Sequence, residues 1–210
     1  MKLLHIIASP RGAKSTTLSI SAEFLTALKA QHPGLLVEEL DLSTEKLPAV
    51  SGEIAEAKYV LMGGGTLSEP SQIAWNEIVA YSQRFLTFDY YLISSPMWNF
   101  TVPYQLKHYI DVIMQPGILF RFTEQGVEGL VKNKKMFCIT SRGSDYSQGG
   151  YLNQFDFQEP YLRSIFGMAG IQDVTFLNAQ PMNITPEIAA SRLAHAIADA
   201  KGIAQRDVYA

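Results

Sequence analysis

Short, mostly apolar runs alternate with longer stretches of helical periodicity along this chain, and this alternation limits the folds open to it. The runs cover residues 2–8, 35–41, 90–94, 135–140 and 173–177. Each has the length of a strand, and between them apolar residues recur at helical spacing. Repeated strand–helix units predict a parallel sheet with right-handed crossovers and helices on both faces.

Five strands in such a sheet favour a flavodoxin-like three-layer α/β sandwich with the strand order 2-1-3-4-5. In this order the crossovers change direction between strands 1 and 3, and ligands bind outside the carboxyl ends of the strands there. The loops at that point are residues 9–17 and 96–100. We therefore expect the functional site between these two loops.

The length and charge of the chain bound its organisation and its partners. With 210 residues it is expected to form one domain, 1–210, whose last residues, 205–210, are either ordered or frayed. A net charge of −3 disfavours a broad nucleic-acid surface, and no stretch approaches the ~20 apolar residues of a membrane span. We expect a cytoplasmic protein that binds neither nucleic acid nor membrane.

The loop after the first strand is rich in hydroxyls and cations. Its polar residues are Ser9, Arg11, Lys14, Ser15, Thr16 and Thr17. They surround the expected start of a helix, where unpaired amides and the helix dipole favour an anion such as a terminal monophosphate. The alternative is a serine-rich cap that binds nothing. Because the loop lacks the glycine pattern of dinucleotide folds and the Walker lysine pattern, a mononucleotide is favoured.

The loop after the third strand combines large apolar side chains with one amide. It reads Pro96, Met97, Trp98, Asn99 and Phe100. Such a loop at the carboxyl edge suits a flat, apolar ligand with a hydrogen-bonding rim, and the alternative is simple core packing.

Two further segments carry candidate site residues. Ser141, Arg142, Gly143 and Ser144 follow the fourth strand, where Arg142 either anchors a carbonyl or anionic group or is a surface arginine. Residues 118–122 read as the start of a small hairpin-like lid or wall. Its Phe120 and Phe122 either wall the substrate face, in the same or the partner subunit, or pack at a sheet edge. The glycines at 63–65 are expected to be a flexible joint between helices.

Neither metal ligands nor acid–base groups cluster in the sequence. The four histidines are scattered without ligand spacing, and His5 is expected to be a structural histidine inside a strand. Cys138, the single cysteine, excludes an internal disulfide and a multi-cysteine metal site. We expect no metal site and no catalytic side chain.

Taken in order, the motifs resemble the FMN-dependent NADH azoreductases and quinone reductases of bacteria. The motifs are Ser9-Pro10-Arg11-Gly12, Ser15-Thr16-Thr17, Pro96-Met97-Trp98-Asn99-Phe100, Phe120-Arg121-Phe122-Thr123-Glu124, Glu128-Gly129-Leu130 and Thr140-Ser141-Arg142-Gly143. The resemblance covers nearly the whole chain. Trp98 and Ser144 depart from it, since the family often has tyrosine and a second glycine there.

The resemblance implies a flavodoxin-like homodimer with FMN bound near the subunit interface. It assigns Ser9 and residues 15–17 to the FMN phosphate, residues 97–100 to the isoalloxazine ring, and residues 141–144 to the pyrimidine side of that ring. It favours NADH over NADPH as the electron donor, a choice for which the sequence itself carries no fingerprint.

These observations together predict an FMN-dependent NAD(P)H oxidoreductase. We expect tightly bound FMN to take a hydride at N5 from the nicotinamide and to pass two electrons to a quinone or azo compound in a ping-pong cycle. A flavodoxin-type electron carrier without small-molecule turnover is the alternative, and a ligand-sensing flavodoxin fold without redox activity is a third possibility.

Overall fold

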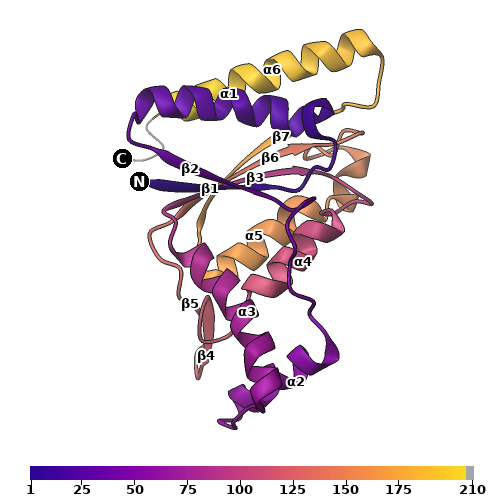
Figure 1. The fold of residues 1–210 in the computed structure, drawn as a ribbon. Coiled ribbons are helices and arrows are strands. Elements are labelled where there is room, and N and C mark those ends of the chain that lie inside the picture. The colour runs from indigo at the N-terminus through magenta and orange to yellow at the C-terminus, as the bar shows by residue number, and fades with distance from the viewer. Residues whose placement is uncertain (207–210) are drawn as a thin grey trace.

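The computed structural model describes residues 1–206 as an α/β sandwich around a five-stranded parallel sheet (Figure 1). Its strands are β1 (Lys2–Ile7), β2 (Leu36–Asp41), β3 (Tyr90–Pro96), β6 (Lys135–Ser141) and β7 (Asp173–Ala179). All of the pairings in this sheet are parallel, so every strand ends at the same edge. Of the predicted tail 205–210, residues 207–210 lie outside the described residues.

The predicted strand order 2-1-3-4-5 is wrong in chain numbering, where the order is β2-β1-β3-β6-β7. The difference arises because β4 (Phe120–Thr123) and β5 (Gly126–Gly129) form an antiparallel hairpin outside the main sheet. This hairpin packs against the end of α5 (Gln158–Ala169), where a Cβ on Gly129 would lie 2.3 Å from the backbone nitrogen of Gly170. The strands predicted as fourth and fifth are therefore β6 and β7.

Helices cover both faces of the sheet (Figure 1). On one face lie α1 (Thr16–Gln31) and α6 (Pro186–Gln205), and on the other lie α3 (Glu69–Leu86), α4 (Tyr104–Ile113) and α5. Helix α2 (Gly52–Met62) packs at the far end of α3, away from the sheet, and the glycines at 63–65 lie between the two helices; the flexibility of this joint stays a prediction. None of the helices within residues 1–206 is long and apolar enough to span a membrane.

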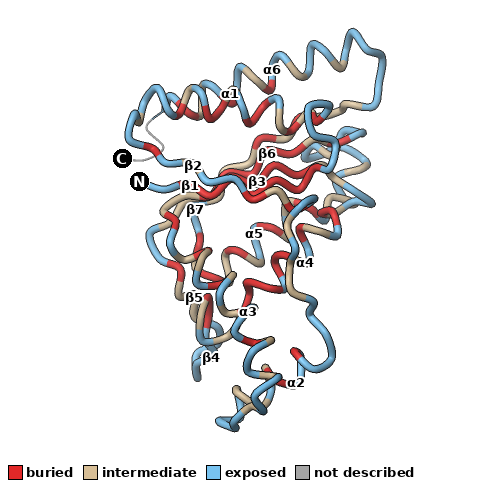
Figure 2. Tube along the Cα trace, in the orientation of Figure 1, coloured by how far each residue is buried: buried red, intermediate tan, exposed pale blue. Residues whose placement is uncertain are grey.

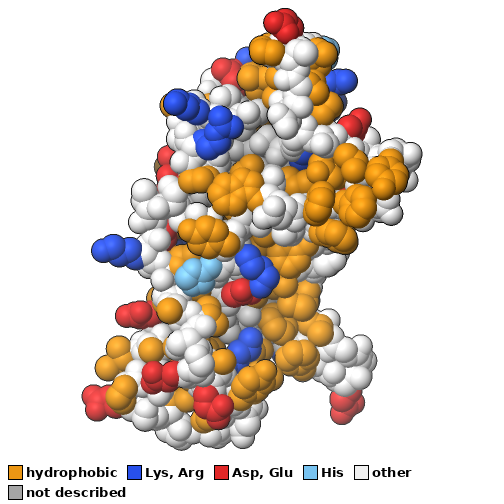
Figure 3. Space-filling model, turned by 90° about the vertical axis from the view of Figure 1, so that its right-hand side faces the viewer, with side chains coloured by type: hydrophobic (Ala, Val, Ile, Leu, Met, Phe, Trp, Pro, Cys, Tyr) orange, Lys and Arg blue, Asp and Glu red, His pale blue; other side chains and the backbone are white. Residues whose placement is uncertain are grey.

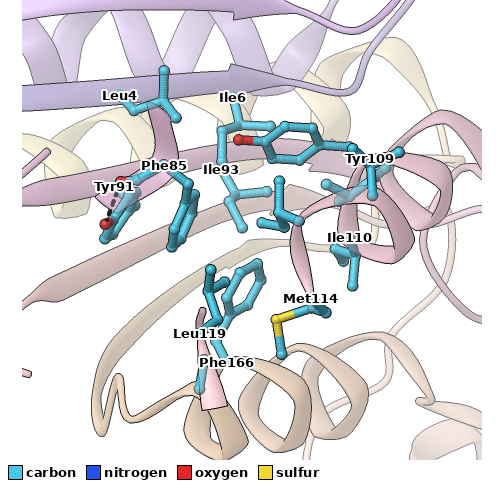
Figure 4. Close-up of a cluster of buried hydrophobic side chains, with 14 of the residues drawn as sticks. Leu4, Ile6, Phe85, Tyr91, Ile93, Tyr109, Ile110, Met114, Leu119 and Phe166 are labelled. Atoms are coloured by element: carbon cyan, nitrogen blue, oxygen red, sulfur yellow. Dashed lines mark hydrogen bonds between the residues drawn. The ribbon is translucent and has the colours of Figure 1, made fainter. Parts of the chain in front are cut away.

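The apolar residues of the strands form a separate core with each helical layer (Figure 2). The larger core, part of which is drawn in Figure 4, contains the stacked rings of Phe85 and Tyr91, whose centroids are 4.1 Å apart. The Tyr91 hydroxyl donates a hydrogen bond of 2.9 Å to the Phe85 carbonyl, which satisfies the only polar atom of a fully buried side chain. Both faces of the sheet are thereby shielded, and the carboxyl edge is left for binding.

A buried polar cluster ties α1 to the centre of the sheet. His5 in β1 is 3 % exposed, and its Nε2 lies 2.7 Å from Ser94 Oγ in β3. Ser94 Oγ in turn lies 2.6 Å from Ser21 Oγ in α1. Burial lowers the pKa of His5 to about 4, so the ring is neutral at physiological pH. The prediction of a structural histidine is confirmed.

Replacing His5 by glutamine, which can keep a hydrogen bond to Ser94 but does not titrate, should reduce the acid sensitivity of the fold. Folded His5 takes up a proton only near pH 4, whereas in the unfolded chain it does so near pH 6.5. Between these values the unfolded state binds more protons. The free energy of unfolding of the wild type should therefore fall by up to about 3 kcal/mol more than that of the variant as the pH falls through this window.

Urea unfolding between pH 4 and pH 7 measures this difference. His195→Gln, at an exposed histidine, is the matched control and should behave like the wild type. Parallel pH profiles for the wild type and His5→Gln would contradict the prediction.

Candidate functional site

Loops from four strands meet at the carboxyl edge of the sheet and enclose a cavity of about 560 Å³, the edge cavity. This volume lies within the ~300–1,000 Å³ typical of small-molecule sites. Its lining residues are Arg11, Thr16, Pro96, Met97, Ser141, Arg142, Gly143, Met182, Asn183, Ala189, Ala190 and Leu193. The three loops predicted from the sequence are therefore brought together at one place.

One end of the edge cavity is the start of α1. Ser15 caps the helix, since its hydroxyl accepts a hydrogen bond from the Leu18 amide at 3.3 Å and lies 2.9 Å from Thr17 Oγ1. The geometry of the helix leaves the amides of Thr16 and Thr17 without an intrahelical acceptor. Together with the exposed Arg11, these donors form a site suited to an anion.

The loop after β3 closes in a tight turn with unusual backbone angles. Trp98 and Thr101 exchange two backbone hydrogen bonds of 2.9 Å, and the residues between them, Asn99 and Phe100, have φ of 46° and 70°. Positive φ at both central positions defines a type I′ turn, in which asparagine is common and phenylalanine is strained by about 1–2 kcal/mol. The turn presents the Asn99 amide and the Phe100 ring at the surface.

The same turn borders a second cavity of about 760 Å³, here called the α4 cavity. Trp98 and Asn99 line it together with residues of α4, such as Tyr104 and His108, and with Tyr161 of α5. Trp98 is 38 % and Phe100 44 % exposed, so the alternative of simple core packing is wrong for these two residues. Figure 3, turned so that the carboxyl edge faces the viewer, shows apolar side chains gathered over this face.

Arg142 is the main departure from the predicted arrangement. Its side chain is 1 % exposed and pairs with Asp156 at 2.8 Å, so the alternative of a surface arginine is wrong. The neighbouring Gly143 and Ser144 are exposed, and the Ser141 carbonyl accepts the Met97 amide at 2.9 Å. The loops after β3 and β6 are therefore joined through their backbones.

Phe120 and Phe122 line neither the edge cavity nor the α4 cavity of their own chain. Their hairpin, β4–β5, lies at the end of the molecule away from the carboxyl edge (Figure 1). Phe120 is 6 % exposed and belongs to the larger core, whereas Phe122 is 62 % exposed. The alternative in which they wall the substrate face of the same subunit is wrong, and the partner-subunit alternative stays a prediction.

Comparison with known proteins gives the same fold and assigns the family. A family profile described as a flavodoxin-like fold matches residues 1–203. An FMN-dependent NADH:quinone oxidoreductase of Ruegeria pomeroyi is 40% identical over 188 residues, covering 89% of this chain and 92% of the relative. FMN-dependent NADH:quinone oxidoreductase 2 of Pseudomonas syringae pv. tomato is 37% identical over 204 residues, covering 97% of this chain and 98% of the relative.

The chain belongs to the family of FMN-dependent NADH:quinone oxidoreductases. The resemblance seen in its motifs is thereby confirmed, and the chain is an enzyme of this family. Among solved structures, an azoreductase from Bacillus anthracis str. Sterne superposes with a TM-score of 0.89 at 28% identity, covering 98% of this chain and 99% of that one. An FMN-dependent NADH-azoreductase from Bacillus anthracis str. Ames Ancestor, in complex with FMN, gives 0.88 at 25% identity with the same coverage.

Sequence reasoning missed the wall that this oxidoreductase builds from the loop after β7. The amides of Met182 and Asn183 donate to the carbonyls of Arg142 and Gly143 at 2.9 Å, so this loop is tied to the loop after β6. The first turns of α6 complete the wall with Ala189, Ala190 and Leu193. The sequence did carry a signal for this wall, because the loop after the last parallel strand must leave the sheet at the same edge as the other loops.

The turn makes a prediction about stability. Asn99→Ala should lower the free energy of unfolding of the apoprotein by about 1 kcal/mol, because alanine tolerates positive φ less well than asparagine. Asn99→Gly is the matched control: it also removes the amide but accepts the backbone angle, and it should stay within about 0.5 kcal/mol of the wild type. Urea unfolding measures both. An alanine variant as stable as the glycine variant would contradict the assigned turn.

Proposed function

We propose that this enzyme uses FMN to reduce quinones, and also azo compounds, with NADH or NADPH as the electron donor. The observation that carries the proposal is the edge cavity, where a helix start suited to an anion lies near Pro96 and Met97, the apolar residues of the loop that also bears the Asn99 amide. The relatives, which are FMN-dependent NADH:quinone oxidoreductases by name, and the FMN-bound structural neighbour support the same cofactor.

The loop after β1 would hold the FMN phosphate. Ser9, Ser15 and Thr17 are buried beside the cavity, and Arg11 and Thr16 line it. Hydroxyls, helix amides and a guanidinium provide the charge-assisted hydrogen bonds that a phosphate monoester needs. This end of the cavity therefore fixes the position of the cofactor.

The remaining loops would hold the flavin ring. Pro96 and Met97 supply an apolar wall of the edge cavity. Asn99, which lines the α4 cavity from the same loop, can hydrogen-bond the polar rim of the ring. Residues 141–144 border the pyrimidine side, where Arg142 contributes through its position in the wall because its guanidinium is paired inside the protein. Trp98 and Phe100 leave an aromatic surface for the acceptor, which we place against the α4 cavity.

Bound FMN would supply the redox chemistry, taking a hydride from the nicotinamide and passing two electrons to the acceptor in a ping-pong cycle. One catalytic cycle converts NADH, a quinone and a proton to NAD⁺ and a hydroquinone. Cleavage of an azo bond to two amines needs two turns. The protein positions the ring, excludes water from its apolar body and leaves one face open for stacking.

We propose further that the protein is a single-domain homodimer of the cytoplasm. The exposed apolar face in Figure 3 supports an interface at the carboxyl edge. The 62 % exposed Phe122 is free to wall the substrate face of the partner subunit, whereas Phe120 supports it from the core.

Anaerobic spectroscopy tests the function directly. Protein loaded with FMN should lose its visible flavin band on addition of NADH and recover it on addition of menadione. A flavin band that survives NADH would favour the electron carrier, and protein that cannot be loaded with FMN would contradict the proposal.

Asn99→Gly tests whether the loop after β3 binds the flavin ring. This substitution removes the amide but keeps the backbone angle. We therefore expect the dissociation constant of FMN to rise about tenfold, which corresponds to the loss of roughly one hydrogen bond. Asn133→Gly is the matched control, because this exposed asparagine also has a positive φ, 57°, and precedes β6 at the opposite edge of the sheet; it should bind FMN like the wild type. Unchanged affinity in Asn99→Gly would remove this residue from the site.

A further inference from the structure

A buried polar cluster lies behind the wall of the edge cavity and is not used by the proposed chemistry. Arg142 is its centre: Nη1 donates to Asp156 Oδ2 at 2.8 Å, and Nε donates to Gln158 Oε1 at 3.3 Å. Nη2 makes no hydrogen bond within the described residues and lies 3.9 Å from Glu159 Oε2. The side chain of Arg142 is 1 % exposed and Gln158 is fully buried.

The cluster is connected to the loop that would hold the flavin ring. Gln158 Nε2 donates to the Pro96 carbonyl at 2.9 Å, and the Phe157 amide donates to the Phe100 carbonyl at 3.0 Å. The start of α5 thus holds the loop after β3 at both of its ends. Asp156 orders this start, because its Oδ1 accepts the amides of Gln158 and Glu159 at 3.0 and 3.1 Å.

Charge balance gives Asp156 a second role. A buried guanidinium is costly unless a carboxylate compensates it. Glu159 is a weaker counter-ion than Asp156, because its carboxylate also binds Arg163 at 2.8 Å and Asn178 at 2.8 Å. Asp156 is therefore the main partner of the charge that Arg142 places in the wall of the edge cavity.

We propose that Asp156 and Gln158 are positioning residues for the flavin: Gln158 holds the Pro96 carbonyl, and Asp156 neutralises Arg142 at the cavity wall. This inference rests on the proposed function. Its consequence is that the redox potential of the bound FMN depends on Asp156. Reduced flavin carries more negative charge than oxidised flavin, so an uncompensated Arg142 would favour the reduced form.

Three variants separate charge from position. Asp156→Asn keeps an oxygen for the α5 amides but removes the negative charge. The preference of this variant for reduced over oxidised FMN should rise about tenfold. The redox potential of the bound FMN should therefore shift by ~30 mV to more positive values, as for a two-electron couple. Arg142→Gln should shift the potential in the opposite direction. The double variant Arg142→Gln/Asp156→Asn should return it close to the wild-type value.

Gln158→Met tests position without a change of charge. The Pro96 carbonyl loses its donor and Arg142 Nε loses its acceptor, while Asp156 still pairs with the guanidinium. We expect the FMN dissociation constant to rise about tenfold, with a potential near that of the wild type. Glu23→Gln is the matched control for removal of an acid from an ion pair, since Glu23 binds Lys201 at 2.6 Å between α1 and α6. Glu23→Gln should change neither the FMN dissociation constant nor the redox potential.

Spectroelectrochemistry of the FMN-loaded protein and FMN titration of the apoprotein give the two readouts. If Asp156→Asn does not fold, Arg142→Gln and the double variant still test the sign of the shift. Folded charge variants with the wild-type potential and a Gln158→Met variant with the wild-type FMN affinity would overturn the inference, even if all of them melted earlier. Wild-type protein that binds no FMN would instead overturn the proposed function, and this inference with it.

Discussion

Parallel pairing of buried strands is the constraint on which the rest of this structure depends. Because β1, β3, β6 and β7 run in one direction between two helical layers, each must end at the same edge, and the following loops have no other place to meet. The edge cavity is the result of this geometry. Its chemistry is set by the loop residues, since the helix start after β1 offers donors and Pro96 and Met97 at the end of β3 offer apolar surface.

The site is supported by polar contacts that lie behind it. His5, Ser94 and Ser21 tie α1 to β3, the strand that leads into the loop at residues 97–100, and Gln158 holds the end of that strand at the Pro96 carbonyl. The strained turn at Asn99 and Phe100 persists because backbone hydrogen bonds fix it on both sides. Buried hydrogen bonds and the backbone-bonded turn thus hold the loops at the edge where binding is expected.

Much of this could be predicted from the sequence where the signal is local. Apolar runs located the five strands of the sheet, and Ser15 marked the start of α1, because strand burial and helix capping depend on neighbouring residues. Arg142 could not be placed, since its partner Asp156 is brought to it only by the packing of α5. The position of Phe120 likewise depends on where the hairpin docks, and the hairpin changed the strand numbering. Asn183 could have been found from the loop after β7.

The central claim is that the loops of the carboxyl edge form one FMN site. A crystal structure of the protein grown with excess FMN tests it most directly. The account predicts one FMN per chain, with its phosphate at the amides of Thr16 and Thr17 and its ring beside Met97 and Asn99. An edge cavity that stays empty at saturating FMN, or FMN bound elsewhere on the chain, would contradict it.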